Sequence, residues 1–186
     1  MKLLTLLIVL FILQSHSMSD SVQEKIRYGK SLSGINDTLA LSVLTEAYLT
    51  AATAGDSALM LESGYAAAFQ KRSMFKFSDA LQDYRTLHKL ALALHDTMSI
   101  YNITAEFGYI YYRIGEYKEA LQFYNTALIL AERINSPGIL AGALTNLGVL
   151  FDKWGYFDSA RDRYTQALKL QQNVYDSAGV ANTQIN

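Results

Sequence analysis

The sequence contains no cysteine, one proline and no excess of either charge. Without cysteine the chain forms no disulfide and carries no lipid-modified cysteine, so its stability must come from packing. A single proline, Pro137, is typical of an almost wholly helical protein, because proline interrupts helices. The formal net charge of −1 leaves no surplus of lysine and arginine for a nucleic-acid surface. We therefore expect no nucleic-acid partner within this chain.

Motifs for catalysis and cofactor binding are also missing. The sequence has no Walker loop, no dinucleotide-binding glycine pattern and no thiol nucleophile, and its carboxylates are scattered singly. Ser73 and Lys76 have the S-x-x-K spacing of penicillin-binding enzymes, but no K-T-G motif accompanies them. His88 and His95 are two helical turns apart, about 10 Å, which is too far to share a metal ion. We expect no enzyme activity, no cofactor and no metal site here.

A membrane-spanning run is absent, and the only long apolar stretch lies at the start of the chain. Lys2 precedes eleven residues from Leu3 to Leu13, fewer than the roughly 20 that a bilayer requires. Ser15 and Ser17 have the spacing of a signal-peptidase site. We interpret residues 1–17 as a secretory signal peptide, with an uncleaved anchor or a plain helix as alternatives. The protein is then expected in a periplasm or outside the cell, free or attached to the membrane through a region beyond Asn186.

The sequence does contain a repeat of forty residues. Gly108 and Gly148 are 40 residues apart, and so are Gly115 and Gly155. A period between 20 and 50 residues indicates a solenoid, in which each repeat stacks on its neighbours. The repeated structural positions are small or aromatic: Ala68, Ala80, Tyr84, Gly108, Gly115, Ala120, Tyr124, Ala127, Gly148, Gly155, Ala160, Tyr164 and Ala167.

Each repeat is expected to form two helices. In the clearest repeat the first helix is predicted from Thr97 to Arg113 and the second from Tyr117 to Ile134, with a turn at Gly115. Apolar residues follow Ala120 at helical spacing, which indicates an amphipathic helix. An aspartate followed by a hydroxyl residue recurs at positions 56, 96 and 176, and Ser136 precedes Pro137. These pairs predict four helix caps in the same phase of the repeat.

Glycine in a helix costs roughly 1 kcal/mol relative to alanine, so its recurrence predicts a packing role. We expect that Gly108 and Gly148, facing alanines of the partner helix, let two helix backbones approach closely. Residues 18–60 are interpreted as degenerate capping helices, with a first helix at about Ser21 to Gly34 and a second around Leu44. Residues 61–100, 101–140 and 141–180 form three repeats, and residues 181–186 match the start of a further, truncated repeat of a longer array.

The pattern resembles the tetratricopeptide repeat family from about Leu61 onward. The residues that carry the resemblance are Gly108, Tyr111, Gly115, Tyr117, Ala120, Tyr124 and Ala127, and again Gly148, Phe151, Gly155, Phe157, Ala160, Tyr164 and Ala167. The family's terminal proline is missing, which is a departure from its pattern. The period of 40 exceeds the usual 34, so each helix is expected to be longer, as in the extended variants that bind peptides along an inner groove. The resemblance implies an all-α fold, a right-handed α-solenoid of antiparallel helix pairs.

The resemblance also implies a ligand groove along the concave face of the first helices. Asn146 matches an asparagine that holds the ligand backbone in many grooves of this family, and an amide can both donate and accept hydrogen bonds. Tyrosine and arginine dominate binding hot spots. The matching positions are Tyr65, Phe69, Arg72, Asn102, Glu106, Tyr109, Tyr112, Arg113, Thr145, Asn146, Val149, Asp152 and Lys153; the alternative is that they are ordinary solvated helix residues.

Two functions are compatible with these expectations. The first is a scaffold that binds a protein or peptide outside the cytoplasm through that groove. The second is the N-terminal periplasmic sensor region of a bacterial histidine kinase or transcriptional regulator. The sequence identifies neither the partner nor the oligomeric state.

Overall fold

The computed structural model describes residues 18–184, and this range consists of helices joined by short turns, without a strand. The predicted signal peptide, residues 1–17, lies outside the described residues, as do residues 185–186. No helix in the described range combines the length and the apolar character that crossing a bilayer demands. The chain divides into two compact units after Ala93.

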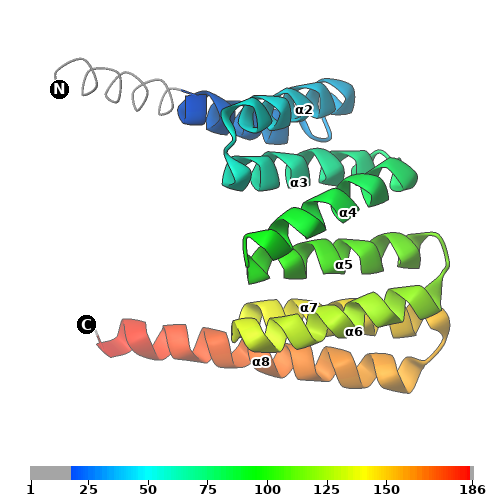
Figure 1. The fold of residues 1–186 in the computed structure, drawn as a ribbon. Coiled ribbons are helices and arrows are strands. Elements are labelled where there is room, and N and C mark those ends of the chain that lie inside the picture. Colours follow the sequence, from blue (N-terminus) through cyan, green and yellow to red (C-terminus); the bar gives the residue numbers. More distant parts are fainter. Residues whose placement is uncertain (1–17, 185–186) are drawn as a thin grey trace, which may run out of the picture. The chain divides into compact units, whose positions relative to one another are not determined.

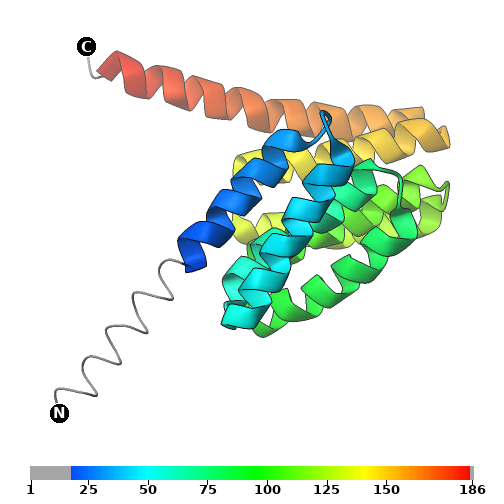
Figure 2. The ribbon, with the colours of Figure 1, turned by 90° about the horizontal axis from the view of Figure 1, so that it is seen from above.

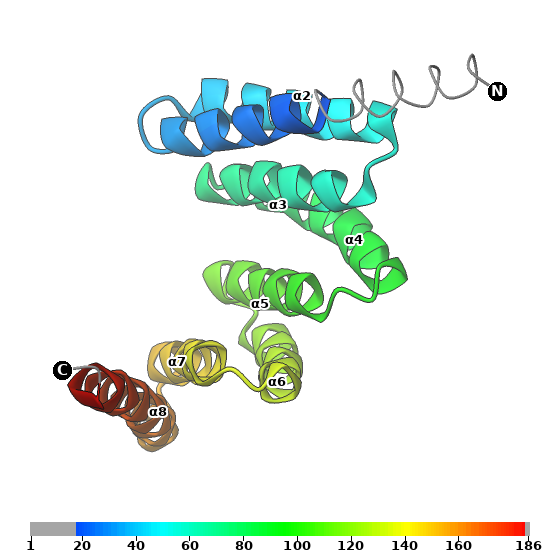
Figure 3. The same ribbon diagram turned by 90° about the vertical axis from the view of Figure 1, so that its left-hand side faces the viewer.

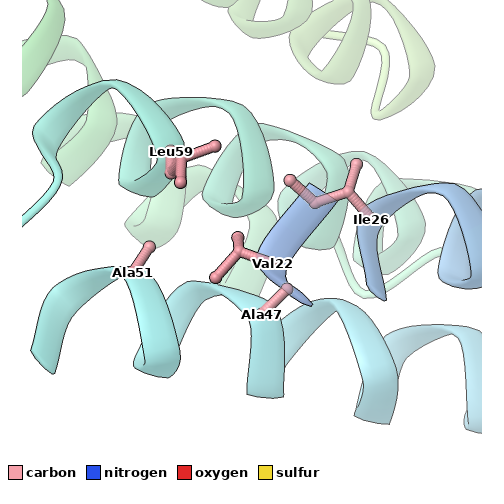
Figure 4. Packing of buried hydrophobic residues seen from close by; sticks show 5 residues of the cluster. All are labelled: Val22, Ile26, Ala47, Ala51 and Leu59. Carbon is pink, nitrogen blue, oxygen red and sulfur yellow. The ribbon is translucent and has the colours of Figure 1, made fainter. Parts of the chain in front are cut away.

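Unit 1 contains a helix over residues 18–32, followed by α2 (Asp37–Ala54), α3 (Ser57–Ser73) and α4 (Phe77–Ala93). The helix 18–32 lies beside α2, to which a short turn connects it (Figure 2). The α3 helix contacts both α2 and α4 (Figure 1). Three of these helices share one buried cluster, made of Val22, Ile26, Ala47, Ala51 and Leu59 (Figure 4).

Unit 2 contains α5 (Thr97–Arg113), α6 (Tyr117–Ile134), α7 (Pro137–Trp154) and α8 (Phe157–Gln184). The bounds predicted for α5 and α6 are confirmed. The α7 helix packs against α6 and α8 and also contacts α5 (Figure 3). The last helix, α8, is longer than α7 and runs past its end (Figure 1).

The second helix of each pair buries residues at the same positions of the repeat. A small residue comes first and an aromatic residue or leucine lies four places later, where it reaches the facing helix. Alanine is common at these positions because its short side chain lets the helices pack closely. The buried residues are Ala40, Leu44, Ala47 and Ala51 in α2, Ala80, Tyr84, Leu87 and Ala91 in α4, and Ala120, Tyr124, Ala127 and Ala131 in α6.

The recurring helix glycines make room for a ring. A Cβ atom on Gly108 would lie 2.5 Å from Cδ1 of Tyr124, and one on Gly148 would lie 2.6 Å from Cε1 of Tyr164. The tyrosine ring fills the space above each glycine, and the close approach of the two helix backbones remains a prediction. Gly29 has the same role in the first pair, where its Cβ would lie 2.6 Å from Cγ of Leu44.

Two of the predicted aspartate caps are confirmed. Asp56 accepts a hydrogen bond from the Leu59 N–H at 3.0 Å, and Asp96 accepts one from the Ser99 N–H at 3.0 Å. Ser136 occupies the N-cap of α7 with proline next to it, but its side chain makes no capping bond. These bonds satisfy N–H groups that the first turn of a helix leaves without partners.

The cap predicted at Asp176 and Ser177 is wrong. The structure has one continuous helix, α8, from Phe157 to Gln184, through both residues. An aspartate caps a helix only where the chain has already left helical geometry, and nothing before Asp176 stops α8. The boundaries at 180 and 181 remain predictions.

Candidate functional site

The expected groove residues divide between the two units. Tyr65, Phe69 and Arg72 lie on α3 in unit 1, whereas the others lie on α5 and α7 in unit 2. Because α5 contacts α7 directly, the second set shares one surface, which we call the α5–α7 face. Its residues are Asn102, Glu106, Tyr109, Tyr112 and Arg113 from α5, and Thr145, Asn146, Val149, Asp152 and Lys153 from α7.

On α3, Phe69 and Arg72 form a pair. The guanidinium carbon of Arg72 lies 4.1 Å from the centre of the Phe69 ring, a cation–π contact. Tyr65 is half-buried instead, and its ring centre lies 5.7 Å from that of Tyr84 on α4. Tyr65 therefore contributes to the packing of α3 on α4, while Phe69 is the exposed member of this set and Arg72 is half-buried.

On α5, Tyr109, Tyr112 and Arg113 lie within one turn of the helix. Arg113 Nη1 donates a hydrogen bond to the Tyr109 hydroxyl, and its guanidinium carbon lies 5.5 Å from the ring centre. The ring centres of Tyr109 and Tyr112 are 6.4 Å apart. Residues three or four apart share one side of a helix, so the sequence spacing brings these three together as expected.

Tyr109 and Tyr112 begin a strip of neighbouring aromatic rings, and this aromatic strip extends beyond the predicted residues. Tyr112 lies 6.4 Å from Tyr117, Tyr117 lies 5.8 Å from Trp154, and Trp154 lies 5.3 Å from Tyr156, measured between ring centres. Tyr117 begins α6 and Trp154 ends α7, so the strip joins two helix pairs. Sequence reasoning missed Trp154, although it falls forty residues after Ile114, at the same turn of the repeat.

The α5–α7 face also carries polar side chains. Asn146 is half-buried. Lys153 is exposed and Asn102 of α5 is half-buried. The face therefore combines an aromatic strip with an amide and both signs of charge, since Asp152 is exposed as well.

One end of the face reaches α8. Burial raises the pKa of the Tyr164 hydroxyl, and the nearby Asp152 carboxylate and Tyr112 hydroxyl raise it further. Asp152 of α7 and Tyr164 of α8 line the same hollow at this point. A hollow of about 330 Å³ continues from it along α8, and its lining residues are Asp152, Phe157, Ala160, Arg161, Tyr164, Thr165 and Leu168.

The side chains of the α5–α7 face include aromatic rings, amides and single charges. Within 18–184 no three histidine or acidic side chains gather in a way that could hold a metal ion. Ser73, the serine of the S-x-x-K spacing, ends α3 and donates its hydroxyl to the Phe69 carbonyl at 3.0 Å. Aromatic rings, an amide and single charges are groups that bind a polypeptide.

Comparison with known proteins supports the repeat family. Residues 96–173 match the family model described as tetratricopeptide repeat, which covers α5, α6, α7 and the first part of α8. A TPR repeat-containing protein of Methanocaldococcus jannaschii is 33% identical over 75 residues, 40% of this chain. The chain spans only 12% of that relative's length.

Solved structures share the all-helical repeat fold. BtubC from P. vanneervenii has a TM-score of 0.68 at 20% identity, over 88% of this chain and 74% of its own. A Rap protein complexed with competence and sporulation factor has a TM-score of 0.75 at 18% identity, over 90% and 51%. PlcR of Bacillus thuringiensis, in complex with the peptide PapR7 and DNA, has a TM-score of 0.56 at 15% identity, over 94% and 75%. At these identities the similarity shows the fold alone, and it confirms an α-solenoid of paired helices.

Proposed function

We propose that this chain is a tetratricopeptide-type scaffold that binds an extended peptide or a segment of a protein on the α5–α7 face. The observation that carries the proposal is the cluster of Tyr109, Tyr112 and Arg113 on α5, a helix in direct contact with α7, which carries Asn146. The similar structures of a Rap protein complexed with competence and sporulation factor and of PlcR in complex with the peptide PapR7 support it.

The face suits an extended backbone for two reasons. An asparagine amide can donate to a peptide carbonyl and accept from a peptide N–H at once, and Asn146 projects from a rigid helix. Tyrosine rings offer large apolar contact area with few rotatable bonds, so little entropy is lost when a ligand covers them. The partner's side chains would then pack along the strip from Tyr109 toward Tyr117.

The test selects binding peptides from a random display library against the full chain. Dissociation constants of the selected peptides are then measured with the wild type and with variants of the face. Tyr109→Ala is expected to weaken binding about 30-fold, typical of a hot-spot residue, and Asn146→Ala about 10-fold.

Asn125→Ala is the matched control, because Asn125 is an exposed asparagine on α6 that lies outside the α5–α7 face. It should leave affinity unchanged. The proposal is wrong if the library yields no binder, or if selected peptides bind the Tyr109 and Asn146 variants as tightly as the wild type.

We also propose that the protein acts outside the cytoplasm. The support is the sequence pattern of residues 1–17, a lysine followed by eleven mostly apolar residues and two spaced serines. Expression in a bacterium followed by mass spectrometry of the exported product should find Met18 at the N-terminus. A product that retains Met1 in the cytoplasm would contradict this location.

A sensor region is the second candidate. The observation that favours it is the similarity to PlcR, whose structure contains both a peptide and DNA. In such a protein the same face would bind the signal and a further region would carry the output. The coding sequence downstream of Asn186 separates the two: a membrane helix followed by a kinase or a DNA-binding region supports the sensor, and a stop after one or two more repeats supports the free scaffold.

A further inference from the structure

Unit 1 contains a hollow that the α5–α7 face does not use. Its volume is about 300 Å³, and it lies between α2 and α4 with α3 beneath it. Gly64 and Ala67 of α3 form its floor and are both buried. The walls and rim are Thr45, Tyr48 and Leu49 from α2, Lys71 at the end of α3, and Asp83, Thr86 and Leu87 from α4.

Unit 2 shows why the hollow exists. The residues eighty positions after Gly64 and Ala67 are Leu144 and Leu147 of α7. These leucines pack in two clusters that share Leu128 of α6. Unit 1 has glycine and alanine in place of these two leucines, so α3 contributes no long side chain to the floor of the hollow.

Gly64, in the floor of the hollow, also makes room for a larger side chain on α4. Leu87 occupies the position where the other second helices carry alanine, at residues 47, 127 and 167. A Cβ on Gly64 would lie 2.6 Å from Leu87 Cδ2 and 3.0 Å from Tyr48 Cδ2. Gly64 therefore accommodates Leu87 and Tyr48, and these two side chains make apolar walls.

The two charged side chains at the rim of the hollow neutralise each other. Lys71 Nζ lies 2.6 Å from Asp83 Oδ2, and both side chains are partly buried. The hydroxyls of Thr45 and Thr86 donate to carbonyls of their own helices and keep oxygen lone pairs available. The lining thus carries no net charge and has a few hydrogen-bonding groups near the rim.

We propose that this hollow is a binding site for a small, uncharged, largely apolar molecule of one or two fused rings. An apolar cavity of about 150 Å³ holds one benzene molecule, so a hollow of about 300 Å³ has room for two rings. A charged ligand would have to enter an apolar floor and compete with the ion pair of Lys71 and Asp83, which disfavours it. The site is independent of the peptide-binding face.

The probe is 5-fluoroindole, an uncharged two-ring molecule with one N–H, titrated against the full chain and followed by ¹⁹F NMR. We expect a saturable shift of its resonance with the wild type. Thr86→Trp places a large ring over the opening from an exposed position on α4, and it should weaken binding at least 10-fold. Ala67→Leu, which copies Leu147 of unit 2, should do the same by filling the floor.

Thr126→Trp is the matched control on α6. Thr126 is exposed forty residues after Thr86, and both hydroxyls donate to the carbonyl four residues earlier. This variant should bind 5-fluoroindole as the wild type does. Circular dichroism spectra that match the wild type establish that each variant folds.

A second prediction concerns the charge of the ligand. Indole-3-acetate should bind the wild type more weakly than indole, and Asp83→Asn should reverse this order by releasing Lys71 for the ligand's carboxylate. The proposal is overturned if 5-fluoroindole shows no saturable binding, if the Thr86 and Thr126 variants behave alike, or if the anion binds the wild type more tightly. Tighter binding of N-acetyl-tryptophanamide than of indole would also overturn it, in favour of a partner's side chain.

Discussion

The ring of Tyr164 covers Gly148, so that a Cβ on residue 148 would lie only 2.6 Å from Tyr164 Cε1. Gly108 and Tyr124 have the same relationship one repeat earlier, at 2.5 Å from Cδ1. The two rings differ in their surroundings. Tyr124 is 4% exposed and packs against Leu147 and Leu150, whereas Tyr164 is 38% exposed on the last helix. The Tyr124 ring therefore has less room to move away from an added methyl group.

We expect Gly108→Ala to lower the free energy of unfolding by about 1–3 kcal/mol, the usual cost of overpacking. Gly148→Ala should cost less, because Tyr164 can turn toward solvent, while Gly148→Leu should reach the same 1–3 kcal/mol. Urea denaturation followed by circular dichroism measures these differences.

Gly142→Ala is the control in the same helix as Gly148. Its nearest neighbour would be the Tyr101 hydroxyl at 3.8 Å, an ordinary contact. The substitution should therefore stabilise the protein by up to about 1 kcal/mol through helix propensity. Equal effects of Ala at positions 108 and 142 would show that the tyrosine ring does not require the glycine.

The repeat made most of the fold predictable. A period of forty residues aligned the turns, and the turns set the bounds of α5 and α6. The apolar spacing after Ala120 identified the buried positions of α6 because a helix buries one stripe. On α5, residues three and four apart share a side, so the cluster of Tyr109, Tyr112 and Arg113 was also predictable.

Contacts between distant segments could not be predicted in this way. Gln70 is buried where the later repeats have isoleucine and leucine; it accepts a hydrogen bond from Ser33 Oγ at 2.6 Å and donates one to Asp37 at 2.7 Å. Gly29 was missed because it lies 15 residues before its partner Leu44, whereas Gly108 lies 16 residues before Tyr124. This difference of one residue shifts the glycine out of the forty-residue register while the packing rule stays the same.

The cap of α5 gives a prediction with a pH dependence. Asp96 accepts hydrogen bonds from the Ser99 hydroxyl at 2.7 Å and from the Ser99 N–H at 3.0 Å. Asp96→Ala should cost about 1 kcal/mol at neutral pH. Ser136→Ala is the control, because Ser136 occupies an N-cap without a side-chain bond, and it should change stability by only a few tenths of a kcal/mol.

The two Ser99 bonds hold the pKa of Asp96 below its ordinary value of 3.8, the hydroxyl bond contributing most. The folded protein therefore binds this proton less tightly than the unfolded chain does. The stabilisation is complete above pH 3.8 and is lost as the pH falls through the lowered pKa of the folded state. Unfolding curves of the wild type and Asp96→Ala should converge in acid; a gap that stays constant would refute the charged cap.

A third prediction concerns the backbone conformation of the turns between the helices. From the turn after α2 onward, one residue in each turn has a left-handed backbone, at intervals of twenty residues: Gly55, Phe75, His95, Gly115, Asn135 and Gly155. A side chain other than glycine is strained there, by about 1 kcal/mol or more. His95 is exposed with φ 53°, so His95→Gly should raise the free energy of unfolding by about 1 kcal/mol.

Gly115→Ala tests the same turn position in the opposite direction. Its φ of 88° is unfavourable for alanine, and no atom would lie within 4 Å of the new Cβ. A loss of about 1 kcal/mol would therefore come from the backbone rather than from a clash. Urea denaturation of the two variants should show changes in the free energy of unfolding of opposite sign. Changes of the same sign would mean that side-chain contacts, and not the backbone angle φ, determine the stability of these turns.

The last prediction concerns Asp152 of α7 and Tyr164 of α8, which line the same hollow. The pKa of Tyr164 is raised from its ordinary value of 10.0 by burial, and then by the Asp152 carboxylate and by Tyr112. A negative charge disfavours the phenolate, so Asp152→Asn should lower the pKa of Tyr164 toward 10.0 without reaching it, because the burial remains. ¹³C NMR of Cζ-labelled tyrosine measures the titration, and Tyr164→Phe assigns the resonance.

Asp162→Asn is the matched control for this titration. Asp162 lies on α8 two residues before Tyr164, and its carboxylate accepts a hydrogen bond from Gln166 at 2.8 Å. It is not one of the groups that shift the Tyr164 pKa, so its removal should leave the titration where it was. If both variants moved the pKa equally, the shift would reflect the general charge of this region. A specific response to Asp152 instead establishes that the end of α7 approaches α8 at Tyr164, where the α5–α7 face meets the hollow.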